Sequence, residues 1–212
     1  MIESLLPPAV MAVEAFDDGE AAPLFPEEEA SVARAVDKRR YEFATGRRCA
    51  RVALERLGVA VGPVPVGANR EPVWPAGIVG SITHCTGYRA AAVARDTDVA
   101  AVGIDAEPHE PLPDGLLTTV ARPVEVAHLA ELGRQHPDVA WDRLLFCAKE
   151  AIYKVWYPVT RRWLGFEQAE VVFEPATGTW AAALLVPAPL ETLNGRYLVA
   201  NGLLLAAVTV PI

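Results

Sequence analysis

The stretch FATGRRCARVAL, residues 43–54, has a counterpart later in the chain in FCAKEAIYKVWY, residues 146–157. When the two are superposed, Phe43 falls on Phe146 and Arg51 falls on Lys154. Each stretch has helical spacing, and each is followed by strand-like segments with a glycine turn and an alanine-rich strand. The repetition predicts two similar α+β halves. Few positions are identical, so chance similarity is the alternative.

The pattern on either side of these stretches predicts the other elements. A helical region runs from Glu27 to a stop at Gly58, and Gly46 divides it into two helices. A lead-in at 1–26 is mainly extended, and the proline- and glycine-rich segment 59–77 is a loop. Helices are expected at 124–132 and 141–156, and strands at 78–85, 88–95, 99–107 and within 169–212, with turns at Thr86-Gly87, Thr177-Gly178, Asn194-Gly195 and Asn201-Gly202.

The expected fold class is therefore α+β. We predict a pseudo-dimer in one compact unit, with an N-terminal α+β half at residues 1–105 and a C-terminal α+β half at residues 106–212. An internal repeat of this kind leaves a cleft between its halves, and ligand sites commonly lie in such clefts. We expect the active site there.

Composition excludes several classes of protein. The 212 residues carry a formal charge of −8, which argues against nucleic-acid binding, because that needs a basic surface. The three cysteines are far apart and odd in number, so neither a disulfide framework nor a cysteine zinc site is expected. The N-terminal sequence does not fit a signal peptide, and no apolar stretch is long enough to span a membrane. These features predict a cytoplasmic protein.

Two carboxylates stand close together in GIDAE, residues 103–107. On a strand, residues two apart face the same way, so Asp105 and Glu107 lie side by side. Like charges this close repel unless a cation or protons lie between them. Mg²⁺ prefers oxygen ligands and is the natural candidate, with Mn²⁺ as a substitute. The alternative is an ordinary polar strand end.

A second pair of charges lies within the helix expected at 141–156. Glu150 and Lys154 are four residues apart and therefore share a face of the helix. The alternative is a surface ion pair worth roughly 0.2–0.5 kcal/mol. The helix is otherwise unusually apolar, which leaves only a narrow charged face and favours a functional role.

Cations gather near the N-terminal end of the chain. Six of them lie within residues 38–51, including Arg39 and Arg47, so this acidic protein carries a local anion-attracting patch. The guanidinium fork suits phosphate oxygens. The alternative is a solvated helix face. His84, in the strand SITHC, is a phosphate contact if its imidazole is protonated, and otherwise a structural histidine.

Together these motifs resemble one family. GIDAE, followed about forty residues later by FCAKEAIYK, is similar to the two signature motifs of Sfp-type 4′-phosphopantetheinyl transferases. THC upstream resembles a third motif, and RRYEFATGRRCAR resembles the basic motif of the siderophore-synthetase (EntD-like) branch. WYPVTRRWLGFEQAEV resembles actinobacterial members. The likeness spans residues 38–173 in the correct order.

The resemblance implies an enzyme that moves the 4′-phosphopantetheine arm of coenzyme A onto a serine of an acyl or peptidyl carrier protein, releasing adenosine 3′,5′-bisphosphate. It implies a pseudo-dimeric fold with coenzyme A between the halves. The implied roles are a Mg²⁺ site at Asp105, Glu107 and Glu150; catalysis by Glu150 as base and Lys154 as charge stabiliser; and coenzyme A contacts from Arg39, Arg47, His84 and Lys154.

One departure from the family pattern concerns the loop before Trp74. It reads VGANREP and lacks the lysine that related proteins often place there, so Arg70 is the candidate replacement. The expected partners are coenzyme A and carrier proteins, with no nucleic acid and no membrane, and the expected state is a monomer. The alternatives are a metal-dependent nuclease and a non-catalytic coenzyme A-binding protein.

Overall fold

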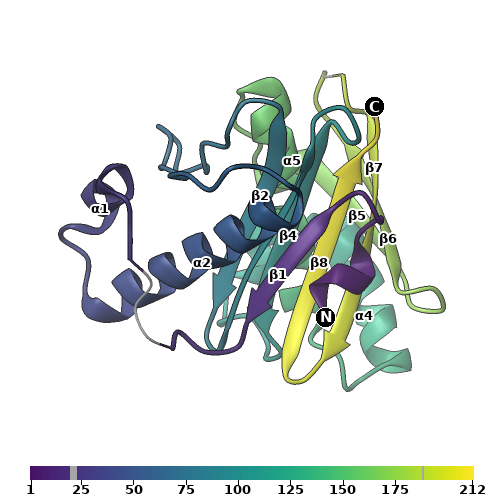
Figure 1. The fold of residues 1–212 in the computed structure, drawn as a ribbon. Helices are drawn as coiled ribbons and strands as arrows, with labels where there is room; N and C mark the ends of the chain where they lie inside the picture. The colour runs from purple at the N-terminus through teal and green to yellow at the C-terminus, as the bar shows by residue number, and fades with distance from the viewer. Residues whose placement is uncertain (20–22, 188) are drawn as a thin grey trace.

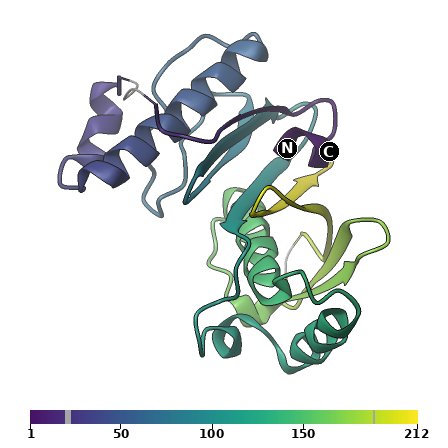
Figure 2. The same ribbon diagram turned by 90° about the horizontal axis from the view of Figure 1, so that it is seen from below.

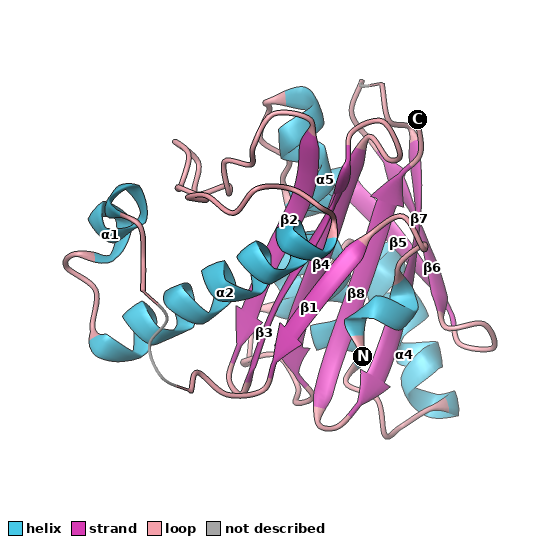
Figure 3. Ribbon diagram, in the orientation of Figure 1, coloured by secondary structure: helices cyan, strands magenta, loops and turns pink. Residues whose placement is uncertain are grey.

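The chain folds around two antiparallel sheets that lie next to each other (Figure 1). The structure is a computed structural model and describes residues 1–19, 23–187 and 189–212. Parts of the predicted extended lead-in, at 20–22, and of the predicted C-terminal strand region, at residue 188, therefore lie outside the described residues. Figure 3 shows how helices flank the sheets. The α+β class predicted from the sequence is confirmed.

The first sheet has three strands in the order β1-β3-β2. Its helix α2 crosses the sheet and buries Cys49, Ala50, Ala53 and Leu54 against β3 (Figure 1). The elements of this unit are η1 (Ile2–Leu5), β1 (Met11–Ala15), α1 (Pro26–Val32), α2 (Asp37–Arg56), β2 (Ile78–Cys85) and β3 (Tyr88–Arg95).

The second sheet has five strands in the order β4-β8-β7-β6-β5. Helix α5 packs on it through an apolar face that includes Leu144, Ala148, Ile152 and Val155. The elements of this unit are β4 (Ala101–Pro108), α3 (Leu117–Val120), α4 (Pro123–Gln135), α5 (Trp141–Thr160), η2 (Phe166–Gln168), β5 (Ala169–Glu174), β6 (Thr179–Leu184), β7 (Thr192–Ala200) and β8 (Leu203–Val210).

The two units share one topology. Each begins with a strand, continues through helices, and ends in a hairpin whose last strand pairs antiparallel with the first, as β3 does with β1 and β8 with β4. Figure 2 shows the two units as separate lobes meeting at the central strands. The predicted pair of similar halves is therefore confirmed as an architecture. The division predicted after residue 105 falls within β4, which pairs with β8 over its whole length.

Strands β4 and β8 lie at the centre of the molecule. One face packs against α5 through Ala101, Leu204 and Ala206, and the other packs against the N-terminal unit through Val102, Ile104 and Leu205. Both strands are thus buried on both sides, which explains why AVGIDA and LLLAAV read as nearly continuous apolar runs.

Side-chain hydroxyls join the two sheets. β2 and β4 belong to different sheets, yet the amide of Ile104 donates to Ser81 Oγ (3.1 Å), and the amide of Ala106 donates to Thr83 Oγ1 (3.1 Å). The matching order of these contacts shows that the strands run in the same direction. We call this junction of β2 and β4 the hydroxyl seam. It replaces a backbone ladder at the boundary between the halves.

Most predicted elements are present, including the hairpin 78–95 and its turn at Thr86-Gly87. The helix break predicted at Gly46 is wrong: α2 runs through Gly46, whose missing side chain leaves room for Ile82 of β2, and the break lies at 33–36. The turn predicted at Asn194-Gly195 is also wrong, because both residues lie inside β7. Among the described residues, no helix is both long and apolar enough to cross a membrane.

Candidate active site

The candidate site begins with a close approach between β4 and α5. A Cβ atom on Gly103 would lie 2.2 Å from the carbonyl oxygen of Ala151, so only glycine allows this contact. Since residues two apart on a strand share a face, Asp105 and Glu107 point the same way as Gly103, towards α5. The close packing therefore brings these carboxylates beside Glu150 and Lys154.

Asp105 forms the centre of the site and is buried. Its Oδ1 accepts hydrogen bonds from Lys154 Nζ (2.7 Å) and from Thr83 Oγ1 (3.0 Å). Lys154 Nζ also donates to the carbonyl of Ile104 (2.9 Å). Asp105 Oδ2 is buried, and no partner for it lies among the described residues. Buried carboxylate oxygens without a partner are rare, so this atom is a candidate ligand for a cation.

Glu107 lies at the strand's exit, where Arg143 of α5 donates to its Oε2 (3.0 Å). Burial raises the pKa of Glu107, and the charge of Asp105 raises it further, while Arg143 opposes both effects. Sequence reasoning missed Arg143. The sequence does contain one indication of its role, because Arg143 lies seven residues before Glu150, two turns earlier on the same face of the helix.

Glu150 projects from α5 towards the same carboxylates. Burial raises its pKa, Asp105 and Glu107 add to the rise, and Lys154 lowers it. The structure thus brings Asp105, Glu107, Glu150 and Lys154 close together, and we call this group the acidic cluster. A carboxylate whose pKa is raised in the direction of neutral pH is suited to accept a proton during catalysis.

A divalent cation was predicted at this cluster. In the described part of the chain, no three side chains of His, Cys, Asp or Glu are arranged as a ready metal site. Two of the carboxylates already pair with cations, since Lys154 binds Asp105 and Arg143 binds Glu107. The donor chemistry nevertheless fits Mg²⁺: the oxygens are carboxylates, Asp105 Oδ2 lacks a partner, and burial, with like charges adding to it, raises the pKa of both glutamates.

His84 and Arg39 meet at the N-terminal side of the site. Arg39 Nη1 donates to His84 Nε2, and Glu42 of α2 lies 3.7 Å from Arg39 and 3.8 Å from His84 Nδ1. Arginine has no acceptor, so Nε2 must be unprotonated. Burial and, after it, the neighbouring cations, Arg39 first, together lower the pKa of His84 to about 4. The protonated imidazole considered from the sequence is therefore neutral in the ligand-free protein.

Arg47 lies about two helical turns beyond Arg39 on α2, against the ring of Phe43. Its Nε donates to the carbonyl of Val64 (2.7 Å), and burial lowers its pKa to about 10, where it is still charged at neutral pH. No partner of its terminal nitrogens is seen among the described residues. The Nε end of the guanidinium is therefore held in place, and its two Nη nitrogens are available for another contact.

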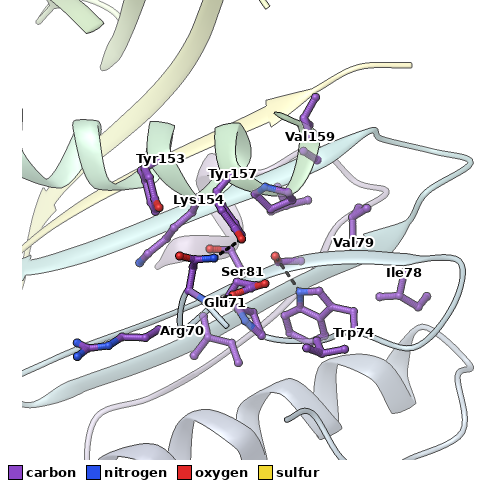
Figure 4. Close-up of a pocket in the computed structure, with 18 of the residues that line it drawn as sticks. Arg70, Glu71, Trp74, Ile78, Val79, Ser81, Tyr153, Lys154, Tyr157 and Val159 are labelled. Atoms are coloured by element: carbon purple, nitrogen blue, oxygen red, sulfur yellow. Dashed lines mark hydrogen bonds between the residues drawn. The ribbon is translucent and has the colours of Figure 1, made fainter. Parts of the chain in front are cut away.

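Arg70 lies on the loop that faces α5 across a cavity of about 480 Å³ between the two units. The loop and β2 supply one wall and α5 the other, through Trp74, Ser81, Tyr153 and Tyr157 (Figure 4). Asn69 Nδ2 donates to Tyr157 across this cavity. Arg70 has a left-handed backbone (φ 68°) and its guanidinium extends away from Trp74 in Figure 4. The predicted cleft between the halves is present, with Glu150 and Lys154 on its wall.

Two further side chains at the site were not singled out from the sequence. Thr83 holds Asp105 and is buried, and Glu42 lies within 4 Å of both Arg39 and His84. Thr83 precedes His84 in the THC segment, and Glu42 lies in RRYEF, so both were inside quoted motifs. Their roles depend on contacts between strands or between α2 and β2, which linear spacing does not reveal.

Comparison with known families covers most of the chain in two parts. Residues 27–94 match the model of the 4′-phosphopantetheinyl transferase N-terminal domain, and residues 101–200 match that of the 4′-phosphopantetheinyl transferase superfamily. The two matches meet at the linker before β4 and together contain Arg39, Arg47, His84 and the acidic cluster.

Comparison with individual proteins points to the same family as the family models. The chain is 51% identical to 4′-phosphopantetheinyl transferase Svp of Streptomyces mobaraensis, over 99% of this chain and 89% of that one. It is 46% identical to 4′-phosphopantetheinyl transferase PptT of Mycobacterium tuberculosis, over 98% and 97%. Enterobactin synthase component D of Escherichia coli O157:H7 is more distant, at 34% identity over 59% of this chain and 58% of that protein.

Proposed function

Because the chain belongs to the Sfp-type 4′-phosphopantetheinyl transferases, enzymes that activate carrier proteins with the 4′-phosphopantetheine of coenzyme A, we propose that its catalytic centre is the acidic cluster between β4 and α5. The observation that supports this most directly is Asp105, a buried carboxylate that bonds Lys154 and keeps one oxygen without a partner. The actinobacterial relatives are the nearer group, and the siderophore-synthetase branch is more distant.

The proposed cation ligands are Asp105, Glu107 and Glu150. Bound Mg²⁺, or Mn²⁺ in its place, supplies charge neutralisation for the pyrophosphate of coenzyme A. The protein's own part is to place the buried Asp105 near the half-buried Glu107 and Glu150, where burial and repulsion between the carboxylates raise the pKa of both glutamates. A cation relieves that repulsion, so we expect it to bind with a gain in stability.

Coenzyme A is proposed to lie between the units, with its phosphates towards the cations. Arg39 and Arg47 would hold the adenosine 3′-phosphate end, and His84 and Lys154 would contact phosphates of coenzyme A. Arg70 is proposed as a weaker contact from the cavity's rim, since its side chain points away from Trp74 (Figure 4). A phosphate beside His84 would favour the protonated imidazole and so raise its low pKa.

The reaction joins the carrier's serine oxygen to the phosphorus that bears the pantetheine arm. The bond from that phosphorus to the adjoining phosphate oxygen breaks, and adenosine 3′,5′-bisphosphate leaves. Glu150 takes the serine proton, directly or through water, and its raised pKa suits that task. Lys154 steadies the charge that develops on the leaving phosphate. Thr83 and Lys154 keep Asp105 in position.

The setting we propose is the cytoplasm, with the enzyme acting as a monomer on carrier proteins. The cysteines Cys49, Cys85 and Cys147 are all free, which suits a reducing compartment. The serine nucleophile comes from the carrier protein, so none is required from this chain.

Transfer of a fluorescent coenzyme A arm onto a carrier protein tests the metal site. Chelation by EDTA should abolish transfer, and added Mg²⁺ or Mn²⁺ should restore it. Asp105→Asn keeps an oxygen for Thr83 but removes the charge, and should lower turnover by about a thousandfold, or ~4 kcal/mol of transition-state stabilisation.

The matched control is a carboxylate that touches the same arginine. The Glu110 side chain is 65% exposed and lies 3.5 Å from Arg143, whereas the Glu107 side chain is only 18% exposed. Glu107→Gln should reduce activity strongly, and Glu110→Gln should not. Full turnover of the wild-type enzyme in EDTA would rule out the proposed metal site.

A further inference from the structure

The fully buried carboxylate Glu28 lies outside the acidic cluster, in the short helix α1. It accepts four hydrogen bonds: from the amide of Phe25 (3.0 Å), from the amide of Val64 (2.8 Å), and two from Arg51 Nη1 (2.9 and 3.2 Å). A buried charge persists only when it is paired and hydrogen-bonded in this way. The carboxylate therefore ties α1, α2 and the loop at residue 64 together.

The loop residue held by Glu28 is also the partner of Arg47. The amide of Val64 donates to Glu28, and the carbonyl of Val64 accepts from Arg47 Nε at 2.7 Å. Val64 is itself fully buried. A continuous chain of hydrogen bonds thus runs from Glu28 through the backbone of Val64 to the guanidinium of Arg47. The charge of Glu28 also favours protonated Arg47, opposing the effect of its burial.

The second unit contains the same device. Glu125, like Glu28, is the third residue of a helix that begins with proline, and it accepts from the amides of Arg122 (2.7 Å) and Val171 (2.8 Å). Its cation is Lys149 of α5 (2.7 Å), next to Glu150. In both units a buried glutamate pairs with a cation of the long helix that carries functional side chains.

We propose that Glu28 is a positioning residue for coenzyme A: through Val64 it fixes the guanidinium of Arg47 in the orientation that binds the adenosine 3′-phosphate. This inference rests on the proposed function of Arg47. It predicts that the charge of Glu28 matters for the ligand's 3′-phosphate and not for the chemical step, because Glu28 lies on α1 and does not contact the acidic cluster.

Steady-state kinetics with coenzyme A and 3′-dephospho-coenzyme A test the proposal. Glu28→Gln should raise KM for coenzyme A about tenfold, which equals ~1.4 kcal/mol, and leave kcat nearly unchanged. The KM for 3′-dephospho-coenzyme A should stay the same. The matched control is Glu29→Gln on the same helix, which removes an exposed pairing with Arg40 and should change neither constant.

A double-mutant cycle with Arg47→Ala separates positioning from a general loss of structure. If Glu28 acts through Arg47, Glu28→Gln should have no further effect in the Arg47→Ala background. An equal effect in both backgrounds, or equal losses with both ligands, would overturn the inference. Should Glu28→Gln fail to fold, Glu28→Asp withdraws the carboxylate by one methylene group and takes its place, with the same expected pattern.

The double-mutant cycle also distinguishes a failure of this inference from a failure of the proposed function. If Arg47→Ala weakens coenzyme A and its dephospho analogue alike, the assignment of Arg47 to the 3′-phosphate is wrong, whatever Glu28 does. If Arg47→Ala discriminates between the ligands but Glu28→Gln does not, only the positioning role of Glu28 is wrong.

Discussion

His84 shows how strongly one residue's chemistry depends on its neighbours. In the sequence it is a single histidine on a strand, with either a structural or a phosphate-binding role. In the structure Arg39 donates to it, and burial together with nearby cations lowers its pKa to about 4. The imidazole is therefore a neutral acceptor until an anion arrives.

The low pKa of His84 makes stability depend on pH. Its folded pKa of about 4 lies below the unfolded value of ~6.5, so the contribution of neutral His84 is complete above pH 6.5 and is lost as the pH falls towards 4. The His84 side chain is 38% exposed, so solvent screening reduces the effect to about 1 kcal/mol, or ~2–4 °C in Tm.

We expect His84→Gln to flatten this dependence. Thermal melts without coenzyme A, at several pH values between 7.5 and 4.5, should show wild-type Tm falling relative to the variant. A constant difference between the two proteins over that range would contradict the low pKa.

At the scale of elements, two Asn-Gly pairs in one hairpin behave differently. Asn201-Gly202 forms the turn between β7 and β8, with φ of 54° and 73° at its two residues, as that dipeptide favours. Asn194-Gly195 lies within β7, where Gly195 faces the indole of Trp180. Gly202 is required by its positive φ, whereas Gly195 is required because Trp180 leaves no room for a side chain.

These glycines should differ in their tolerance of alanine. A Cβ on Gly195 would lie 2.1 Å from Trp180 and 2.6 Å from the carbonyl of Ala207, so Gly195→Ala should destabilise the fold by about 3 kcal/mol. Gly202 has no atom within 4 Å of that position, so Gly202→Ala should cost only about 1 kcal/mol for its left-handed backbone. Urea denaturation of both variants provides the comparison, and equal losses would contradict it.

The same contrast explains what the sequence could and could not predict. Periodicity and turn dipeptides predicted the hairpin at 78–95 and helix α5 closely, because those signals are local. The missed features at Gly46 and Gly195 depend on Ile82 and Trp180, which come from distant elements. At the candidate site, motif order predicted Asp105, Glu107, Glu150 and Lys154, whereas the bonds of Thr83 to Asp105 and of Arg143 to Glu107 join separate elements and are seen only in the structure.

At the scale of the whole molecule, charge limits how a carrier protein can approach. The enzyme has a net charge of −8, and the family's carriers are expected to be acidic, so long-range attraction is weak. Arg161 and Trp163 follow directly after α5, and their side chains are 68% and 76% exposed respectively. Trp163 packs on Tyr153, a residue of the inter-unit cavity. We call Arg161 and Trp163 the rim of the cavity. The rim combines positive charge with an exposed aromatic ring.

We predict that carrier proteins dock at this rim. Arg161→Glu should raise KM for the carrier by up to about fivefold, or ~1 kcal/mol, and should reduce the salt dependence of that KM. The affinity for coenzyme A should hardly change. The measurement is steady-state transfer at several ionic strengths.

Arg134→Glu is the matched control for docking. Arg134 on α4 has the same side-chain exposure, 68%, and the substitution changes net charge equally. It should leave the carrier's KM unchanged if the rim acts locally. Equal effects of the two variants would instead show that overall charge governs the encounter.

The hydroxyl seam lets the two sheets differ in size. A shared backbone ladder demands two edges of matched length and phase, whereas this seam needs a serine and a threonine two positions apart on one strand. The two units can therefore lie side by side while each keeps an intact sheet of its own. The additional strands of the second unit, β5 and β6, lie at the edge of its sheet farthest from the junction, and none of their residues lines the cavity between the units.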